Sequence, residues 1–315
     1  MSVLAIVIPA YKAAFLSKTL ESLALQTNPD FTVYIGNDAG EAGIEEIVNQ
    51  FKDRLDILYQ YFENNLGGSS LVKQWERCFA FIQNEGWIWL LPDDDYADPE
   101  CVELFYDHLQ KSDFDLFRFN VRFVTADEKK IKTNATLPSV QPAFDSLMEK
   151  LSFYRPSTVA EFIFNKKKFE RTGFAEIPMA WGTDDLLWYR IGKDKGIFGC
   201  NDAYVYLRQS DVNISNNYSS MGKEKIAANF IFFEKLLQTE AFAEEMTDEK
   251  RKQDFGKISL AFIMYSLQDF SLKLRVTEMY QFALKGNRIW GGGIIRNMRR
   301  FYLNNKRIEQ KIKRK

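Results

Sequence analysis

The sequence predicts an α/β fold with a mixed, mainly parallel sheet, flanking helices and a helical extension at the C-terminus. Short apolar runs alternate with amphipathic segments through the first hundred residues. A strictly alternating apolar and polar run follows at residues 116–124, and from about residue 222 only long amphipathic segments occur. Hydrophobic residues make up 46% and charged residues 27% of the chain, which is typical of a soluble globular protein.

The first hundred residues predict four strands and three helices. Strands are expected at residues 3–9, 31–37, 55–62 and 87–91. Helices are expected between them, at residues 15–26, 44–51 and 69–83, where apolar side chains recur at helical spacing. Strands and helices that alternate in this way favour a parallel sheet with helices on both sides.

The next segments predict a helix and an antiparallel part of the sheet. Asp98 is expected to cap a helix that has Pro99 at its first position. Residues 116–124 alternate as a half-solvated strand does, and "TADEK" after them is typical of a turn. Further strands are expected at residues 159–165 and 202–208, so the sheet becomes mixed.

Composition excludes several classes of site. The chain has a single histidine, His108, which excludes multi-histidine metal centres. A Ser-His-Asp triad would have to use His108 as its histidine. The three cysteines show no metal spacing, and their odd number argues against a disulfide framework. The N-terminus lacks the pattern of a signal peptide, and no stretch of eighteen apolar residues predicts a spanning helix. We therefore expect a cytoplasmic protein.

The C-terminal residues 285–315 form a strongly basic tail. They hold eleven Lys or Arg residues and one acid, Glu309, so their net charge is +10 in a chain of net charge −1. Such a tail is either solvated or meets an anionic surface. Apolar residues such as Trp290 and Ile294 lie among the cations, so the anionic surface would be that of a membrane at its cytoplasmic face. Nucleic acid is not expected as a partner, because no recognised binding motif accompanies the charge.

Polar groups follow the four predicted parallel strands. In an open α/β sheet, ligands bind beyond the carboxyl ends of the strands. Taken singly, each group also has a purely structural interpretation as a turn or a helix cap. The strands lead in order to "PAYK", "NDAG", "ENNLGGSS" and "PDDDY".

The aspartates at positions 93, 94 and 95 are harder to explain structurally. Adjacent carboxylates repel one another unless a cation offsets their charge. Mg²⁺ or Mn²⁺ is typically held by one or two carboxylates together with phosphate oxygens and water. An EF-hand is excluded, because the loop lacks its central glycine and its alternating ligands. The triplet therefore predicts a site for a metal and a diphosphate.

Four stretches, in this order and spacing, give the chain a resemblance to a known family. They are "AIVIPAYKAAFLSKTLESLALQT", "VYIGNDAG", "NNLGGSSLVKQWERC" and "LLPDDDYADPE". The set resembles the family 2 glycosyltransferases, which have the nucleotide-diphospho-sugar-binding GT-A fold, and the resemblance covers about residues 3–215.

The resemblance implies a donor site. Tyr11 matches the aromatic residue that lies against the nucleotide base, and Pro9 and Ala10 line the same turn. Asp38 matches the acid that hydrogen-bonds the base. One departure is Asn37, which stands where many members have a second acid and is interpreted as structural.

The aspartate triplet and one arginine complete this implied site. Asp94 falls at the family's metal-binding position and Asp95 beside it is expected to support the metal, while Asp93 faces the ribose or assists the metal. Arg208 is expected to neutralise phosphate charge. Many relatives carry a histidine where this chain has Ser210, which puts a further diphosphate contact there in doubt.

The segment "MAWGTDDLLW" gives the acceptor side. By local pattern alone, Thr183 or Asp184 would cap a helix and Asp185 would favour its dipole. The resemblance instead implies that Asp185 is the catalytic base and that Asp184 contacts the acceptor. Trp181 is expected to stack on an acceptor sugar.

The implied domain organisation follows. A GT-A domain is expected over residues 1–220, with a nucleotide-binding half at about 1–98 and an acceptor half at about 99–220. A helical annex at 221–284 and the basic amphipathic tail at 285–315 complete the chain.

The implied activity is a metal-dependent, inverting transfer of a hexose-type sugar from a nucleotide-diphosphate sugar to a hydroxyl of a glycan or lipid-linked acceptor. Polysaccharide or glycolipid assembly at the cell surface is the expected context. Two alternatives remain open. A sugar-nucleotide nucleotidyltransferase shares the fold class, and a non-catalytic nucleotide- or carbohydrate-binding relative would share the pocket.

Overall fold

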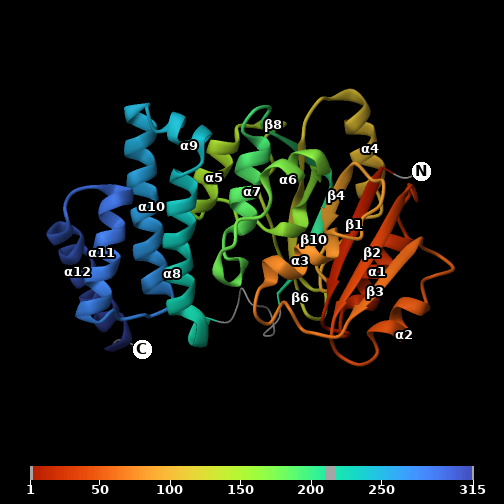
Figure 1. Cartoon of the computed structure of the whole chain (residues 1–315), viewed down its shortest axis with the longest axis horizontal. Helices are drawn as coiled ribbons and strands as arrows, with labels where there is room; N and C mark the ends of the chain where they lie inside the picture. The colour runs from red at the N-terminus through yellow and green to blue at the C-terminus, as the bar shows by residue number, and fades with distance from the viewer. Residues whose placement is uncertain (1–2, 210–217, 314–315) are drawn as a thin grey trace. The chain divides into compact units, whose positions relative to one another are not determined.

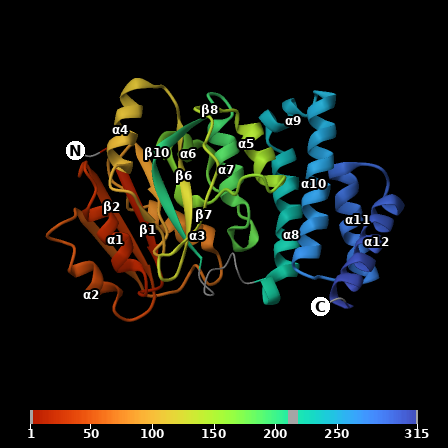
Figure 2. The same cartoon turned by 180° about the vertical axis from the view of Figure 1, so that it is seen from behind.

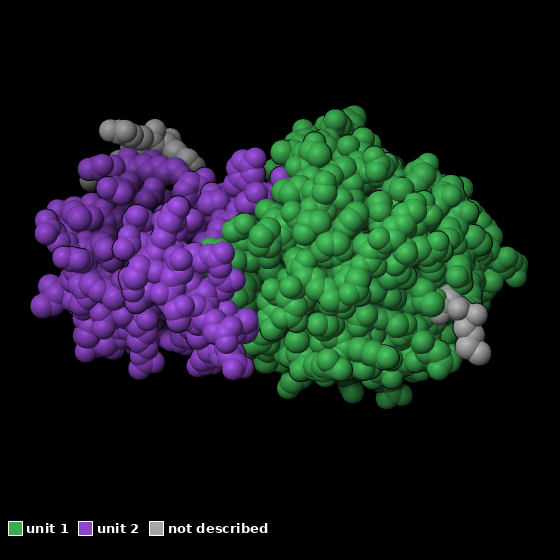
Figure 3. Space-filling model, turned by 90° about the horizontal axis from the view of Figure 1, so that it is seen from above, with its two compact units in different colours: residues 1–145, 157–176, 187–210 green, residues 146–156, 177–186, 211–315 purple. Residues whose placement is uncertain are grey.

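The structure, a computed structural model, describes residues 3–209 and 218–313. The chain divides into two compact units, which Figure 3 shows in different colours. Unit 1 comprises residues 1–145, 157–176 and 187–210, and unit 2 comprises residues 146–156, 177–186 and 211–315.

Unit 1 is built on one mixed sheet (Figure 1). The strand order is β3-β2-β1-β4-β9-β6-β10-β5, with β7 beside β6 and β8 beside β10. Strands β1 to β4 pair in parallel, and the pairs β4–β9 and β9–β6 are antiparallel, so the sheet is mixed as predicted. The strands are β1 (Leu4–Ala10), β2 (Phe31–Asp38), β3 (Ile57–Phe62), β4 (Trp87–Leu90), β5 (Tyr96–Ala97), β6 (Leu116–Thr125), β7 (Lys130–Thr133), β8 (Val140–Gln141), β9 (Phe162–Asn165) and β10 (Ile197–Gln209).

Helices cover both faces of the parallel half of the sheet, as predicted. Ile6 of β1 belongs to a core cluster with residues of α1 (Leu16–Ala24), α2 (Ile44–Asn49) and α4 (Cys101–Lys111). On the other face, α3 (Leu71–Phe79) lies so close to β2 that a Cβ on Gly36 would be 2.3 Å from Cys78 Sγ. Unit 1 also holds α6 (Lys166–Thr172).

Three predictions for the middle of the chain have clear outcomes. The β6–β7 hairpin confirms the turn after residue 124. The expected strand at 159–165 begins only at Phe162, because a 3-10 turn, η1 (Val159–Glu161), precedes it. The prediction that Asp98 caps α4 is wrong. Its carboxylate instead accepts hydrogen bonds from Tyr204 N at 3.0 Å and Tyr206 Oη at 2.8 Å, both on β10.

Strand pairing sets the edge at which ligands can bind. β1 pairs in parallel with β2 on one side and β4 on the other, with Ala10 opposite Asn37 and Val7 opposite Leu90. All but one residue of β1 is buried, which explains its continuous apolar run. The residues that follow β1, β2 and β4 therefore gather at one edge of the sheet.

Unit 2 is helical, which confirms the predicted helical extension (Figure 2). The basic tail is not an isolated segment, because it comprises the end of α11 and the whole of α12. None of the helices in the described ranges is long and apolar enough to cross a membrane. The helices are α8 (Tyr218–Leu237), α9 (Glu240–Glu245), α10 (Glu249–Asp269), α11 (Val276–Trp290) and α12 (Ile294–Lys313).

Three further elements contain residues of unit 2. They are α5 (Ala143–Leu151), the 3-10 turn η2 (Pro178–Ala180) and α7 (Thr183–Gly192).

Candidate active site

The ends of β1 and β4 are joined by a carboxylate. Asp93 follows β4, and its Oδ2 accepts hydrogen bonds from the backbone amides of Tyr11 and Lys12, each at 2.8 Å. Both amides belong to the loop that follows β1. Asp93 therefore fixes the backbone of this loop, and the Tyr11 side chain on it is exposed.

Asp38 ends β2 and orders the loop after β3. Its Oδ1 accepts from Leu66 N at 2.7 Å and its Oδ2 from Gly67 N at 2.8 Å. Arg77 of α3 forms an ion pair with the same carboxylate. A Cβ on residue 67 would lie 2.6 Å from Oδ2, so glycine is required there. Since a carboxylate has about four lone-pair sites, these three contacts use most of its hydrogen-bonding capacity.

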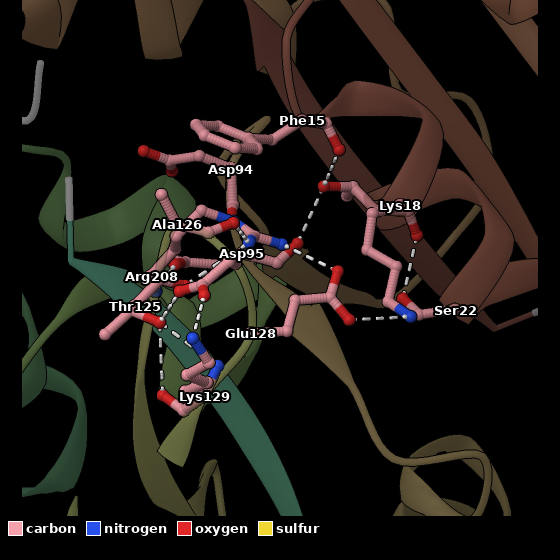
Figure 4. A network of polar contacts seen from close by, with 12 residues as sticks. Phe15, Lys18, Ser22, Asp94, Asp95, Thr125, Ala126, Glu128, Lys129 and Arg208 are labelled. Carbon is pink, nitrogen blue, oxygen red and sulfur yellow. Dashed lines mark hydrogen bonds and ion pairs between the residues drawn. The ribbon is translucent and has the colours of Figure 1, made fainter. Parts of the chain in front are cut away.

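Asp95 and Arg208 join the aspartate loop to β10 (Figure 4). Asp95 Oδ1 accepts from Arg208 N at 2.9 Å, and Asp95 O accepts from Thr19 Oγ1 at 2.7 Å. The Arg208 side chain is only 3% exposed, and it donates to Asp94 O at 3.1 Å and to Ala126 O at 2.7 Å. A diphosphate would have to compete with these carbonyls. The geometry therefore favours Arg208 as a residue that positions the aspartate loop.

Asp94 differs from its two neighbours. Its side chain is half-buried, and Figure 4 shows its carboxylate directed away from the network of contacts. Arg208 donates a hydrogen bond to its backbone carbonyl, the backbone of Asp94 donates to the carboxylate, and the charges of Lys12 and Arg208 lower the pKa of this carboxylate. Of the three aspartates, Asp94 has the carboxylate that is directed away from this network.

The three carboxylates repel one another. Burial and the charge of Asp94 together raise the pKa of Asp93 to about 6, against the two backbone amides that lower it. Burial also raises the pKa of Asp94 and raises that of Asp95 well above its usual value, where Asp94 again adds to the shift. A bound cation would offset this negative charge.

These residues fit a divalent cation that takes some of its ligands from the protein and the others from a substrate. Mg²⁺ and Mn²⁺ commonly take one or two protein carboxylates and complete their shell with phosphate oxygens and water. Asp94 offers such a carboxylate, and Asp95 lies beside it with one oxygen bonded to Arg208 N. Within residues 3–209 and 218–313, no three His, Cys, Asp or Glu side chains are grouped to hold a metal alone.

The second carboxylate group lies in unit 2. Asp184 and Asp185 occupy the first turn of α7, where negative charge is favourable. Asp185 is buried and forms an ion pair with Lys150 of α5, a residue that the sequence analysis did not single out. Burial lowers the pKa of Lys150 to about 8, against the charge of Asp184 that raises it. Burial raises the pKa of Asp184, and Lys150 opposes this shift.

The turn before α7 is strained. Met179 has φ 59° and Ala180 has φ 53°, a left-handed conformation that is uncommon for residues other than glycine. Gly182 has φ 86°, and a Cβ there would lie 3.1 Å from the Phe232 ring of α8. Such strain is typical of sites where the surrounding fold imposes a geometry for function.

The same turn presents Trp181 to α8. Its Nε1 donates to Asn229 Oδ1 at 3.0 Å, and Lys225 Nζ lies 4.5 Å from the ring centroid. One face of the half-buried indole is thus covered by a cation. Trp188, by contrast, is buried against Phe162 at a centroid distance of 4.5 Å.

The structure therefore gathers the expected residues in two groups. The first, in unit 1, is the donor group, and the second, in unit 2, is the acceptor group. Pro9 and Ala10 are the last residues of β1, and Ala10 is fully buried. Ser210 lies outside the described residues. The donor group comprises Pro9, Ala10, Tyr11, Asp38, Asp93, Asp94, Asp95 and Arg208, and the acceptor group comprises Trp181, Asp184 and Asp185.

The comparison with protein families agrees with this geometry. The family described as "Glycosyl transferase family 2" matches residues 5–187, which is more than half of the chain. The chain belongs to glycosyl transferase family 2. A search of curated proteins found no match.

Solved structures show the same fold at low sequence identity. Residues 1–349 of S. aureus TarS in complex with UDP-GlcNAc match with a TM-score of 0.75 and 16% identity, over 100% of this chain and 92% of that one. A longer S. aureus TarS chain matches with a TM-score of 0.73 and 14% identity, over 98% of this chain and 55% of that one. A mannosyltransferase from Pyrobaculum calidifontis in complex with GDP-Man and Mn²⁺ matches with a TM-score of 0.53 and 12% identity, over 96% of this chain and 86% of that one. This glycosyltransferase therefore has the GT-A fold that the sequence predicted.

Proposed function

We propose that this glycosyltransferase moves a hexose-type sugar from a nucleotide-diphosphate sugar to an acceptor hydroxyl with inversion at the anomeric carbon. The observation that carries the proposal is the direction of the Asp94 carboxylate. Asp93 and Asp95 are bonded to backbone amides of neighbouring segments, while Asp94 points away from them. A carboxylate in this position suits a cation that bridges to a diphosphate.

The donor group supplies the other contacts. The Tyr11 ring is exposed at the strand edge for stacking on the base, and Asp38 would accept a hydrogen bond from a base imide with its remaining capacity. When bound, Mg²⁺ or Mn²⁺ would be held by Asp94, with Asp95 in support, and would supply positive charge to the leaving diphosphate. Similar folds crystallised with UDP-GlcNAc and with GDP-Man and Mn²⁺ support this assignment.

On the acceptor side, Asp185 takes the proton from the attacking hydroxyl. The Lys150 ammonium places positive charge against this buried carboxylate and so favours its charged form. It also holds the carboxylate in one orientation, and we assign Lys150 as a positioning residue. Asp184 and the other face of Trp181 would bind the acceptor sugar. A single displacement by this hydroxyl inverts the anomeric configuration.

The acceptor is proposed to be a glycan or a lipid-linked sugar. The corresponding role is polysaccharide or glycolipid assembly for the cell surface, carried out on the cytoplasmic side. The support is the acceptor group itself, which combines an aromatic face with two carboxylates next to a strained turn.

A thermal-shift panel tests the donor site. UDP, GDP, dTDP, CDP and CMP are each added with and without Mn²⁺. A ligand at about a hundred times its dissociation constant adds about 2.7 kcal/mol to the free energy of unfolding. We expect one nucleotide to stabilise the protein only with metal, and Asp94→Asn to abolish this effect. Asp107→Asn, at an exposed carboxylate of α4, is the matched control.

Two results would contradict the proposal. If no nucleotide stabilises the protein in any combination, the donor site is not functional. If a nucleotide binds equally well to Asp94→Asn, the metal assignment is wrong even though the nucleotide pocket exists.

A further inference from the structure

One side of α12 exposes large apolar side chains to solvent. Ile295 is 85% exposed, the largest fraction for a large apolar residue in the described part of the chain, and Tyr302 and Leu303 are 49% and 45% exposed. At 100° per residue, Ile295, Arg299, Tyr302 and Lys306 lie along one face of the helix. The exposed side thus mixes apolar and cationic residues.

The opposite side of α12 already serves the core of unit 2. Asn297, Phe301, Asn304 and Ile308 recur at helical spacing and are buried. Asn304 Oδ1 accepts a hydrogen bond from Gln268 Nε2 at 2.5 Å. The packing of α12 within its own unit therefore does not require the exposed apolar residues.

The exposed side also carries unbalanced positive charge. Residues 294–313 contain seven Lys or Arg residues and one acid, Glu309. Glu309 forms an ion pair with Lys273 at 3.2 Å. Among the described residues, no carboxylate lies within ion-pair distance of Arg296, Arg299 or Arg307, so their charges are available to an anionic partner.

The helix begins beside a rigid hollow. Gly291, Gly292 and Gly293 have φ of 63°, 81° and 82°, conformations that glycine adopts without strain. Asn287 Oδ1 accepts from Gly293 N at 2.9 Å, and Asn297 Nδ2 donates to Gly291 O at 3.2 Å, which fixes the loop. The hollow has a volume of about 650 Å³, and its lining comprises Gly292, Gly293, Ile294, Ile295, Arg296 and Arg299.

We propose that this side of α12 binds the surface of an anionic lipid bilayer. Cations match the negative surface charge, and each Lys or Arg near such a surface contributes about 1 kcal/mol, or about fivefold in binding. Tyr302 and Leu303 lie at headgroup depth between the cations, and Ile295 enters the boundary with the acyl chains. A simply solvated face would gain nothing from the exposure of Ile295. The proposal goes beyond the transfer reaction and does not depend on the donor.

Sedimentation of the full-length protein with lipid vesicles tests the proposal. Vesicles of phosphatidylglycerol and phosphatidylcholine are compared with vesicles of phosphatidylcholine alone, at low and high salt. We expect binding only to the anionic vesicles and release by salt, because screening weakens contacts between exposed charges. The triple variant Arg296→Gln, Arg299→Gln, Arg307→Gln should bind about a hundredfold more weakly.

A matched triple variant controls for net charge. Lys250→Gln, Lys252→Gln, Lys257→Gln removes three exposed cations from α10 and should leave vesicle binding within a fewfold of the unaltered protein. A fourth variant, Ile295→Ser, should weaken binding to the anionic vesicles without changing its salt dependence. Both triple variants should retain the nucleotide-dependent thermal shift.

Three results would overturn the proposal. One is no binding to anionic vesicles at low salt. Another is an equal loss in both triple variants, which would show attraction by net charge alone. The third would come from a competition with double-stranded DNA. If the DNA binds through Arg296, Arg299 and Arg307 but does not displace the protein from the vesicles, these cations bind nucleic acid and not lipid.

Discussion

The two groups of carboxylates in this protein are held by different kinds of partner. Asp93 and Asp95 of the donor group accept hydrogen bonds from backbone amides of the segments beside them. Asp185 of the acceptor group is instead paired with a side chain, that of Lys150. Backbone amides are fixed by the strands and loops to which they belong, while a lysine has several rotatable bonds and can exchange partners.

The comparison assigns different tasks to the two groups. In the proposed function, the donor group is a fixed frame in which Asp94 binds the cation. In the acceptor group, Lys150 positions the base through a side-chain ion pair.

Removing the base should separate chemistry from donor binding. We expect Asp185→Asn to lower kcat by about 10²- to 10⁴-fold, because the acceptor hydroxyl loses its general base. The thermal shift with nucleotide and metal should be unchanged. Asp184→Asn is the matched control and should affect KM for the acceptor more than kcat. An equal loss of kcat in both variants would contradict the assignment of Asp185.

Removing a fixed carboxylate should destabilise the fold. Asp93→Ala leaves the amides of Tyr11 and Lys12 without their acceptor, and we expect a loss of about 3 kcal/mol in the free energy of unfolding. Urea denaturation measures it. Asp94→Ala, one position further on, should not destabilise the protein. If the two variants lose equal stability, the frame does not depend on the Asp93 hydrogen bonds.

The ion pair between Asp185 and Lys150 should affect how kcat/KM depends on pH. Because burial lowers the pKa of Lys150 to about 8, its ammonium is present below pH 8 and is lost above it. We therefore expect kcat/KM to fall above pH 8. Lys150→Arg should move this fall to higher pH, since the guanidinium stays charged.

The variant Lys150→Met provides the complementary result. It should lower kcat/KM roughly tenfold to a hundredfold through misplacement of Asp185 and should lose the fall above pH 8. A rise in activity in Lys150→Met would mean that the lysine restrains the base and does not position it.

The smallest effect should be a gain in stability. Asp94 raises the pKa of both Asp93 and Asp95, so its charge opposes theirs in the protein without metal. We expect Asp94→Asn to raise the free energy of unfolding by about 1 kcal/mol when metal and nucleotide are absent. Calorimetry in the presence of a chelator measures this gain. A loss of stability would show that Asp94 has a structural role after all.

The sequence predicted the sheet and its helices well in the first hundred residues. There, each strand is a continuous apolar run and each helix has a clear apolar side, so local pattern and tertiary environment agree. It failed at Asp98, whose carboxylate is bonded to Tyr204 and Tyr206. Those partners lie more than a hundred residues away, and local capping rules do not include them.

Long-range contacts also explain why the sequence did not predict the roles of Lys150 and Arg77. Each is one cation among many in the sequence, and only the fold brings them to Asp185 and Asp38. The spacing of 35 and 39 residues to these partners carries no periodic signal. No pattern in the sequence alone would have selected them.

The sequence by itself determined the alternation of strands and helices, the run of three aspartates after a buried strand and the basic character of α12. These properties depend on residue type and on short-range spacing. The tertiary structure alone decided how the aspartates differ. Parallel pairing of β1 with β4 brings the Tyr11 and Lys12 amides to Asp93, and β10 brings the Arg208 amide to Asp95. The hydrogen bond to the Asp94 carboxylate comes instead from the backbone of Asp94 itself, and we propose that this carboxylate binds the cation.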